Sequence, residues 1–325
     1  MKAIMQDGYG SAEVLELRDI EDPAVGEDEV LVRVHAAGCG PDVWHMMTGL
    51  PYFARLMVGF RRPKVPVRGR DVAGRVEAVG VKVTGFRPGE EVMGVVEGSF
   101  AELAAARPDR LVRKPARLSF EEAAAVPISG LTALQAVCDQ GQVRPGQRVL
   151  VIGAGGGVGT LAVQIAKAFG AEVTGVCGTS KLELVRSVGA DEVIDYTRED
   201  FADGTRRWDL IVDTAGRRPL SVLRRALGPR GTLAIVGGDG GGRWTGGFFR
   251  MILRAPLLSL VTRQRLRPVM SKERRDDLQA LAELIEAGTV TPVVGRTYPL
   301  VDAPEAVREL EGGHARGKLV VVVRT

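Results

Sequence analysis

The segment from Val149 to Val173 constrains the fold more than any other, because five glycines stand in seven residues between two apolar stretches. The glycines follow a short strand-like run and precede a stretch whose apolar residues recur at helical spacing. A glycine-rich turn that joins a strand to a helix is typical of dinucleotide-binding loops. Tight turns also use glycine for conformational reasons, so the loop alone is weak evidence. The predicted buried stripe of the helix is Val158, Leu161, Ala162, Ile165, Ala166 and Phe169.

The residues around this loop continue an alternation of strands and helices, which strengthens the interpretation. The predicted strands are apolar at almost every position, so both of their faces are buried. This pattern predicts a parallel sheet covered by helices on both sides, a doubly wound α/β fold. The predicted strands are 148–153, 171–177, 191–196, 209–214 and 231–238, and the helices are 158–169, 181–188, 219–227 and 272–287.

The two ends of the chain have a different pattern. Residues 29–38, 71–80 and 90–98 alternate apolar and polar positions between glycine-containing turns, which predicts a compact antiparallel barrel. Ser119 and Glu122 form a capping box that begins a helix, which Pro127 ends. Residues 290–300 and 317–325 are again β-like. We therefore predict an N-terminal domain over 1–119, completed by 289–325, with a second domain over 120–288.

Composition excludes several classes of protein. The 325 residues are enough for two domains, and a net charge of +4 with no long basic block indicates a solvated surface rather than a nucleic-acid-binding face. Three cysteines without a C-x-x-C spacing favour a reducing, cytoplasmic environment. The N-terminal residues lack the pattern of a signal peptide. The apolar stretch Phe248–Val261 is interrupted by Arg250, Arg254 and Pro256, so we expect no membrane span.

The glycine motif predicts how a dinucleotide is held. Its frame is Ala154, Gly156 and Gly159, with alanine where the first glycine usually stands. Gly156 allows the backbone to approach a pyrophosphate, and Gly159 allows the helix to pack closely on the strand. The free N–H groups at the start of the helix then face the phosphates.

The end of the second strand bears on the choice between NADH and NADPH. An NAD site usually has an acidic residue here, whereas this chain has "GTSK", with Ser180 and Lys181, and no acid before Glu183. A hydroxyl and an ammonium suit a 2′-phosphate, so NADPH is favoured. In the alternative interpretation, Ser180 only caps the next helix and Lys181 is solvated.

With these residues identified, the whole chain resembles the medium-chain dehydrogenase/reductase superfamily, in its zinc-free quinone oxidoreductase-like branch. The motifs that carry the resemblance include "GRDVAGRVEAVG", "FRPGEEVMG", "AAAVPISGLTALQAV", the glycine-rich segment and "EGGHARGKLVVVV", in the family's order. The resemblance implies a GroES-like barrel domain, a Rossmann domain, a cleft between them and a homodimer.

The resemblance also implies residues that contact the cofactor. Thr132, Val236 and Gly237 match positions near the nicotinamide. Lys318 matches a position near the cofactor. The other matches are Gly156, Gly157 and Val158 in the pyrophosphate loop, Ser180 and Lys181 at the 2′-phosphate, and Tyr196 beside the adenosine phosphate.

The same resemblance predicts that no metal is bound. Cys39 stands where the zinc branch has a ligand, but Arg70 replaces the ligand histidine of its Gly-His-Glu motif. The third ligand position offers neither Cys nor His, and the cysteine run of the structural zinc site is missing. A catalytic zinc site needs three protein ligands. Cys39 also departs from the zinc-free pattern, where Asn or Ser is common, so its role stays open.

Without a metal, the chemistry is hydride transfer between the cofactor and a substrate that the protein orients. A quinone or enone suits this reaction, because hydride adds at carbon while negative charge moves to oxygen. Candidate proton donors are His45 and Tyr52, although His45 also fits a surface histidine and Tyr52 a stacking wall. Apolar residues between Trp44 and Phe60 suggest a hydrophobic pocket and substrate. The alternatives are a zinc-free alcohol dehydrogenase-like enzyme and a non-catalytic NADPH-binding protein with a structural or RNA-associated role.

Overall fold

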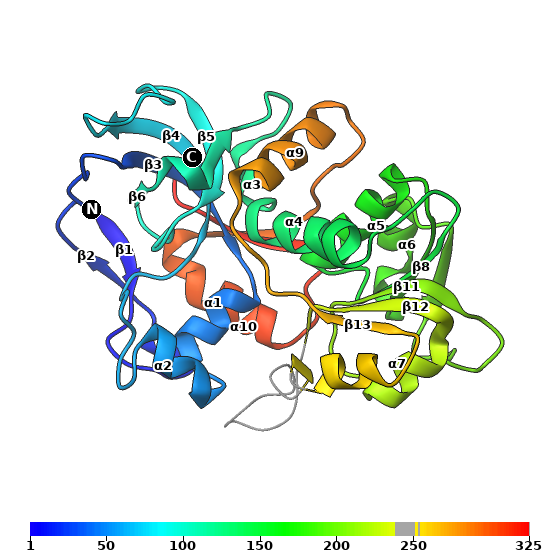
Figure 1. Cartoon of the computed structure of the whole chain (residues 1–325). Coiled ribbons are helices and arrows are strands. Elements are labelled where there is room, and N and C mark those ends of the chain that lie inside the picture. Colours follow the sequence, from blue (N-terminus) through cyan, green and yellow to red (C-terminus); the bar gives the residue numbers. More distant parts are fainter. Residues whose placement is uncertain (238–250, 253, 325) are drawn as a thin grey trace. The chain divides into compact units, whose positions relative to one another are not determined.

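The computed structural model describes residues 1–237, 251–252 and 254–324, and its contacts divide the chain into two units. The first unit comprises Met1–Leu131, Glu273–Ala287 and Pro292–Thr325, and the second comprises Thr132–Lys272 and Gly288–Thr291. Figure 1 shows both units, with many of their elements labelled. The division falls within a helix at Leu131 and places residues 273–287 with the first unit, whereas we predicted them in the second domain.

The second unit is built on a parallel sheet, as its apolar strands predict. The strand order is β10-β9-β8-β11-β12-β13, and every neighbouring pair is parallel. From the middle of the sheet, β8, β9 and β10 follow one another to one edge, and β11, β12 and β13 follow one another to the other edge. This is the Rossmann arrangement. The strands are β8 (Arg148–Ile152), β9 (Glu172–Cys177), β10 (Glu192–Asp195), β11 (Trp208–Asp213), β12 (Leu227–Ile235) and β13 (Arg265–Pro268).

Helices connect these strands close to the predicted places: α5 (Gly157–Ala168), α6 (Leu182–Ser187) and α7 (Leu220–Ala226). Helix α5 is buried at every position from Gly159 to Ala166, which is a wider contact than the predicted stripe. Phe169 was wrongly included in that stripe. It is the C-cap residue that follows the last residue of α5, and its side chain is 42% exposed.

The first unit contains a mostly antiparallel sheet of seven strands, and β3 is its central member. Strand β3 pairs with β4, β6 and β15. Because β15 is the last strand of the chain, the C-terminal segment completes the N-terminal sheet, as predicted. A separate pair is formed by β1 (Lys2–Met5) and β2 (Glu16–Asp19). The sheet comprises β3 (Val30–Cys39), β4 (Asp71–Val79), β5 (Glu91–Val95), β6 (Leu103–Ala106), β7 (Leu111–Arg113), β14 (Val294–Pro299) and β15 (Lys318–Val322).

The helices of the first unit follow their local sequence signals. Ser119 and Glu122 form the predicted capping box, with both reciprocal hydrogen bonds present, at the start of α3. Pro127 does end this helical stretch, and it also begins the next helix, α4. The side chains of Leu278, Leu281 and Ile285 on α9 are buried. The helices here are α1 (Pro41–Thr48), α2 (Arg55–Val58), α3 (Phe120–Ala124), α4 (Pro127–Leu134), α9 (Arg275–Glu286) and α10 (Ala303–Glu311).

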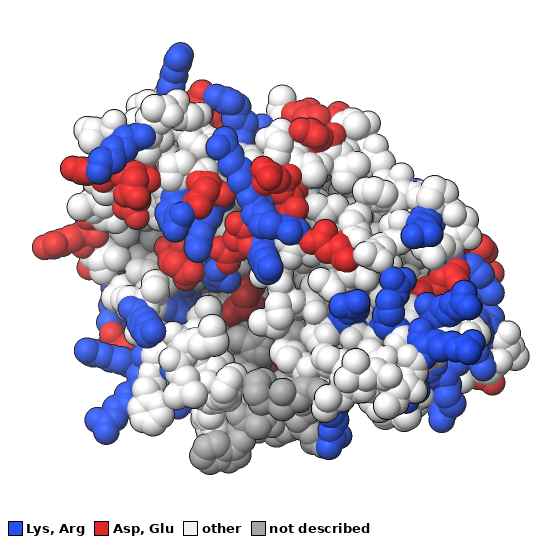
Figure 2. Space-filling view, viewed as in Figure 1, with Lys and Arg blue, Asp and Glu red and all other residues white. Residues whose placement is uncertain are grey.

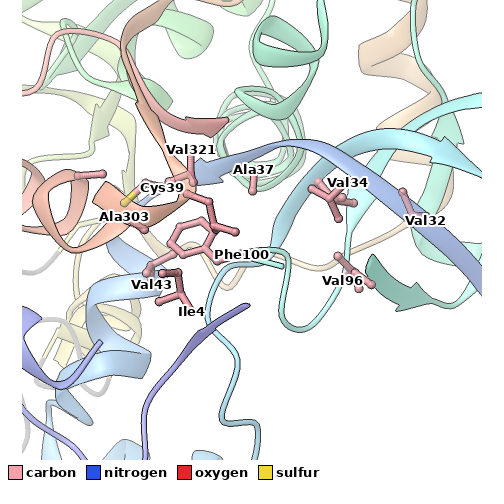
Figure 3. Close-up of a cluster of buried hydrophobic side chains, with 14 of the residues drawn as sticks. Ile4, Val32, Val34, Ala37, Cys39, Val43, Val96, Phe100, Ala303 and Val321 are labelled. Carbon is pink, nitrogen blue, oxygen red and sulfur yellow. The ribbon is translucent and has the colours of Figure 1, made fainter. Parts of the chain in front are cut away.

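The core of the first unit joins segments that are far apart in the sequence. Figure 3 shows Ile4 of β1, Val34 of β3, Phe100 and Val321 of β15 among the side chains that gather there. All four are fully buried. Burial of such side chains supplies the main favourable free energy of folding, so this cluster holds both ends of the chain in one unit.

The charged side chains on the surface are mixed in sign, as the small net charge of +4 suggests. On the face drawn in Figure 2, acidic and basic side chains are interspersed over the first unit. Several of them are ion-paired, including Arg75 with Glu91 and Arg113 with Glu90. Among the described residues, no helix is long and apolar enough to cross a membrane. The stretch Phe248–Val261 lies partly outside the described residues.

Candidate functional site

The carboxyl ends of the strands of the second unit are aligned in register. Ile152 at the end of β8 pairs with Val176 and Asp213, and Asp213 pairs with Ile235. The loops after these strands therefore leave the sheet at one edge, which is where doubly wound folds bind ligands. Most of the predicted cofactor residues lie in these loops: Gly156, Gly157 and Val158 after β8, Ser180 and Lys181 after β9, Tyr196 after β10, and Val236 and Gly237 after β12.

The glycines of the loop after β8 are needed for different reasons. Gly153 has a φ of +82°, a conformation that L-residues rarely adopt. A Cβ on Gly159 would lie 2.1 Å from the backbone oxygen of Gly153, so a glycine here allows α5 to approach β8. A Cβ on Gly156 would lie 3.5 Å from that oxygen, an ordinary contact. The protein itself leaves room at Gly156, which fits a glycine kept free for a ligand.

Lys181 lies against this loop. A Cβ on Gly155 would stand 2.7 Å from Cδ of Lys181, so the lysine side chain runs over the glycine backbone. Ser180 is exposed beside it, in the turn η5 (Thr179–Lys181). The structure therefore brings the aliphatic chain of Lys181 against the loop that leads into α5, whose N-terminal end attracts anions, and Ser180 precedes Lys181 in the same turn.

Asp195 is a residue of this edge that our sequence analysis missed. Its carboxylate accepts hydrogen bonds from the Thr179 hydroxyl at 2.6 Å and from the Thr197 hydroxyl at 2.7 Å. The Thr197 amide donates a third, at 3.0 Å. These hydrogen bonds lower the pKa of Asp195 and hold the turns after β9 and β10 together. Tyr196 is 53% exposed, and its hydroxyl would be 3.4 Å from a Cβ on Gly178.

The residues predicted to lie near the nicotinamide are at a strand end, for Val236 and Gly237, and within a helix, for Thr132. The amides of Val236 and Gly237 both donate to the backbone oxygen of Asp213, which fixes the exit of the chain from β12. A Cβ on Gly237 would lie 2.3 Å from the backbone oxygen of Thr214. Thr132 is 9% exposed on α4. All three positions are thus rigidly held.

In the first unit, Lys318 is the centre of a buried polar cluster. It is the first residue of β15 and is 4% exposed. Its ammonium lies 2.7 Å from Oδ2 of Asp71 and donates to the Ser129 hydroxyl at 3.1 Å. The other oxygen of Asp71 accepts a hydrogen bond of 2.6 Å from the amide of Ile128 at the start of α4. One ion pair thus links β15, β4 and α4.

Asp42 adds a second carboxyl to this cluster. Both of its oxygens are buried, and neither accepts a hydrogen bond from another residue that the structure describes. Burial raises the pKa of Asp42, while the Lys318 ammonium opposes that rise. Burial alone would lower the pKa of Lys318, but Asp71 and Asp42 outweigh it and raise that pKa. A Cβ on Gly40 would lie within 2.8 Å of both Asp42 Oδ1 and Lys318 Nζ, so glycine makes room for the pair.

Cys39 ends β3 beside this cluster. Its side chain is buried, and burial raises the pKa of the thiol to about 12. Metal ligation requires the thiolate, and the nearby charge of Lys318 further disfavours a cation. Among the described residues, no group of three His, Cys, Asp or Glu side chains is placed to hold a metal ion. Arg70, which replaces the ligand histidine, pairs with Glu97 and hydrogen-bonds to Glu273.

The two candidate proton donors lie on adjacent segments of the first unit. His45 is exposed on α1, and its Nδ1 is 2.8 Å from the backbone oxygen of Leu50. A carbonyl only accepts, so Nδ1 carries the proton, and neutral His45 has an acceptor at Nε2. Tyr52 lies in η2 (Tyr52–Ala54), with the Arg55 guanidinium 4.7 Å from its ring centre.

Comparison with known families agrees with this geometry. Residues 26–116 match the model for the alcohol dehydrogenase GroES-like domain. Residues 188–321 match the zinc-binding dehydrogenase model, and residues 131–219 match the C-terminal domain of alanine dehydrogenase and transhydrogenase. The mouse mitochondrial protein named NAD(P)H oxidoreductase RTN4IP1 is 33% identical, with 99% of this chain and 89% of the relative aligned. The chain belongs to the medium-chain dehydrogenase/reductase superfamily, in its quinone oxidoreductase-like branch.

Other relatives of this superfamily member have related names. An Arabidopsis thaliana protein, a chloroplast envelope quinone oxidoreductase homolog, is 31% identical over 99% of this chain and 98% of its own length. The solved quinone oxidoreductase of Coxiella burnetii superposes with a TM-score of 0.87 at 30% identity, covering 100% of this chain and 99% of its own. A solved NAD-dependent alcohol dehydrogenase superposes with a TM-score of 0.85 at 32% identity, and the alignment covers 99% of this chain and 100% of that one.

The glycine loop generates a paired stability prediction. Gly159→Ala places a methyl group against the Gly153 backbone and should reduce the free energy of unfolding by about 1–3 kcal/mol. Gly156→Ala meets only an ordinary contact and should cost less than about 1 kcal/mol, the range of a poorer helix cap. Urea denaturation of both variants measures the difference. Equal losses in the two variants would contradict the distinct roles assigned to these glycines.

The buried cluster generates a pH-dependent prediction. Lys318→Met leaves two buried carboxyls without a cation and should cost about 3–5 kcal/mol near neutral pH. In the variant, burial holds the pKa of Asp42 above that of the unfolded chain, with the opposing Lys318 ammonium gone. Stability is therefore retained at low pH and lost as pH rises from the unfolded-state pKa of Asp42 toward its folded-state pKa. Thermal melts between pH 5 and 8 should show a loss of Tm that grows with pH.

The control for this prediction is the double variant Lys318→Met/Asp71→Asn. The amide oxygen can still accept from Ile128, and one of the uncompensated charges is gone. The double variant should recover part of the lost Tm at pH 8. A Tm loss in Lys318→Met that is independent of pH would show that the lysine acts through packing alone.

Proposed function

We propose that this protein is an NADPH-dependent oxidoreductase that transfers hydride to a hydrophobic quinone, enone or related carbonyl compound without zinc. The observation that carries the proposal is the contact between Lys181 and the glycine loop. The aliphatic part of the Lys181 side chain lies against Gly155, in the loop that we assign to the pyrophosphate. The names of its relatives, NAD(P)H oxidoreductase and quinone oxidoreductase, support the same class of reaction.

The residues at the sheet edge fit a dinucleotide. The amides that begin α5, at Gly157 and Val158, would hold the pyrophosphate, and the space at Gly156 would admit it. Ser180 and Lys181 would hold a 2′-phosphate, with Tyr196 beside the adenosine. Thr132, Val236 and Gly237 would line the nicotinamide end, and Lys318 would lie near the cofactor. When bound, the nicotinamide supplies a hydride, and these side chains only fix its position.

The preference for NADPH over NADH rests on the charges around the turn after β9. An NAD site would offer a free carboxylate to the ribose hydroxyls. The carboxylate of Asp195 already accepts three hydrogen bonds within the protein. Lys181 is the cation of the turn, and a doubly charged phosphate suits it better than a hydroxyl does. The NAD-dependent alcohol dehydrogenase among the similar structures supports the opposite choice, so the cofactor requires a direct test.

A zinc ion does not fit the donor set. Cys39 is the one residue retained from the zinc-branch positions considered, and its neighbour Lys318 is a cation. Arg70 cannot replace an imidazole ligand, because a guanidinium has no lone pair to donate. We therefore derive no step through a metal. Purified protein should keep its activity in a chelator.

Exposed apolar side chains support a hydrophobic substrate. Leu56, Met57 and Phe60 are 66%, 73% and 72% exposed on and after α2. Clusters of exposed apolar residues mark binding surfaces more often than ordinary surface. His45 and Tyr52 flank this segment and stay candidate proton donors, although neutral His45 would have to accept a proton at Nε2 before it could donate one there.

Cellular location and assembly also stay predictions. The three cysteines lie far apart in the sequence, in agreement with a reducing cytoplasm, and the family resemblance implies a homodimer. Light scattering of the purified protein would measure its mass in solution.

A substrate screen tests the proposed function. We expect NADPH oxidation with quinones and alkyl enones, and little turnover of simple alcohols. Faster alcohol oxidation would favour the alcohol dehydrogenase-like alternative. Tight NADPH binding without turnover on a broad panel would favour a non-catalytic role, structural or RNA-associated. Gly156→Val is the matched control, because it fills the predicted pyrophosphate space and should abolish cofactor binding in a folded protein.

The cofactor preference is tested at Lys181. Lys181→Ala removes a charge-assisted contact to the 2′-phosphate, worth about 1.5–3 kcal/mol. NADPH affinity should fall by roughly ten- to a hundredfold, while NADH affinity changes little. Ser180→Ala should act in the same direction with a smaller effect. Kd values from fluorescence titration give the ratio, and equal losses for the two cofactors, or a wild-type preference for NADH, would refute the assignment.

A further inference from the structure

The first unit contains a cavity that none of the predicted cofactor residues lines. Its volume is about 310 Å³, near the lower end of the range for small-molecule sites. Apolar side chains from α1, α2 and the segment before β4 form much of the wall, among them Val43, Met57, Val58 and Val67. Three cations, Lys64, Arg68 and Arg70, and one anion, Glu97, complete the polar part of the lining. The cavity is thus apolar with an excess of positive charge.

Arg68 and Arg70 differ in a way that points to a ligand. Arg70 is neutralised within the protein, since it pairs with Glu97 at 3.3 Å and hydrogen-bonds to Glu273. Arg68 is only 4% exposed, and no hydrogen bond or ion pair joins its guanidinium to another described residue, although the charge of Glu97 acts on it from a distance. The Nε atoms of Arg68 and Arg70 are both buried without a hydrogen bond, but only Arg70 has carboxylates in direct contact. A buried arginine is normally paired, because an unpaired buried charge is costly.

The backbone holds Arg68 in this position. Its amide donates to Ile4 at 3.0 Å, and its carbonyl accepts from Phe100 at 2.8 Å. Gly69 follows with a φ of +88°, and a Cβ there would lie 2.5 Å from both Ser99 and Phe100. The turn at Gly69 therefore fixes two neighbouring arginines in separate environments. Burial lowers the pKa of Arg68 to about 10, so the guanidinium is still charged at neutral pH.

We propose that this cavity binds a compact apolar monocarboxylate, with its carboxylate paired to the Arg68 guanidinium and its hydrocarbon body against Val43, Met57 and Val58. A guanidinium matches a carboxylate through two parallel hydrogen bonds. The apolar wall favours a ligand that buries a hydrocarbon body. Glu97 in the lining disfavours a more highly charged anion such as phosphate. The proposal does not rest on the redox function, because none of the predicted cofactor residues lines the cavity, although Met57 also belongs to the exposed apolar segment that we assign to the hydrophobic substrate.

Octanoate is the probe for this site, measured by isothermal titration calorimetry against the full chain. We expect octanoate to bind the wild type and to lose about tenfold or more in affinity in Arg68→Met, which removes the charge and keeps a similar apolar stem. Lys64→Met is the matched control. It removes a cation from the same lining, but Lys64 is exposed, so the affinity should change by less than about threefold.

Three further ligands separate the contribution of the charge from that of the hydrocarbon body. 1-Octanol should bind Arg68→Met and the wild type alike, because it has no charge. Acetate and inorganic phosphate should bind at least tenfold more weakly than octanoate, because they lack the apolar body. The proposal is overturned if octanoate does not bind at millimolar concentration or binds Arg68→Met as tightly as the wild type. Phosphate binding as tight as that of octanoate would also overturn it.

Thermal stability distinguishes a binding arginine from a structural one. Without ligand, Arg68→Met removes a buried unpaired charge and should raise Tm by about 2–4 °C. Octanoate should raise the Tm of the wild type and not that of the variant. A structural arginine gives the opposite result, with a lower Tm for Arg68→Met and no effect of octanoate on the difference.

Discussion

The ion pair between Lys318 and Asp71 is the interaction on which the first unit depends most. Each residue begins a strand, β15 and β4, and β3 lies between these strands in the sheet. The second oxygen of Asp71 accepts a hydrogen bond from the amide of Ile128, so the same carboxylate also positions the start of α4. A charge pair this deeply buried is expensive to form and more expensive to break. It therefore specifies one register for the last strand of the chain, rather than adding much net stability.

The second unit reaches its function through backbone geometry more than through side chains. The aligned strand ends bring four loops to one edge, and two glycines of one loop serve different needs there. Gly159 is required by the protein, since the backbone of Gly153 occupies the space beside it. At Gly156 a Cβ would make only an ordinary contact within the described structure, and this space is where we propose that the pyrophosphate binds. Lys181 and the hydrogen-bonded Asp195 then give the edge its electrostatic character.

Much of this fold could be predicted because its strands are buried on both faces and therefore uniformly apolar. Strand β13 was not predicted, since Arg265–Pro268 carries two arginines in four residues and lies at the sheet edge, where only one neighbour pairs with it. Phe169 was misplaced because periodicity does not reveal where a helix ends. The sites were harder to predict. Lys318 came from the family resemblance, and its partners Asp42 and Asp71 were missed because local patterns carry no information on contacts between distant segments. Arg68 looks in the sequence like any surface charge, and only its burial distinguishes it.

The pairing of β15 with β3 has a consequence for how this protein is made. A ribosome delivers the chain from its N-terminus at about 5–20 residues per second. Strand β3 emerges early, but its neighbour β15 follows the whole second unit in the sequence. The second unit draws nearly all of its residues from one continuous stretch and can fold during synthesis. The first unit has to wait, with an open sheet edge, until β15 has been synthesised. Nascent chains that stall before Lys318 would therefore present β3 to chaperones or to one another.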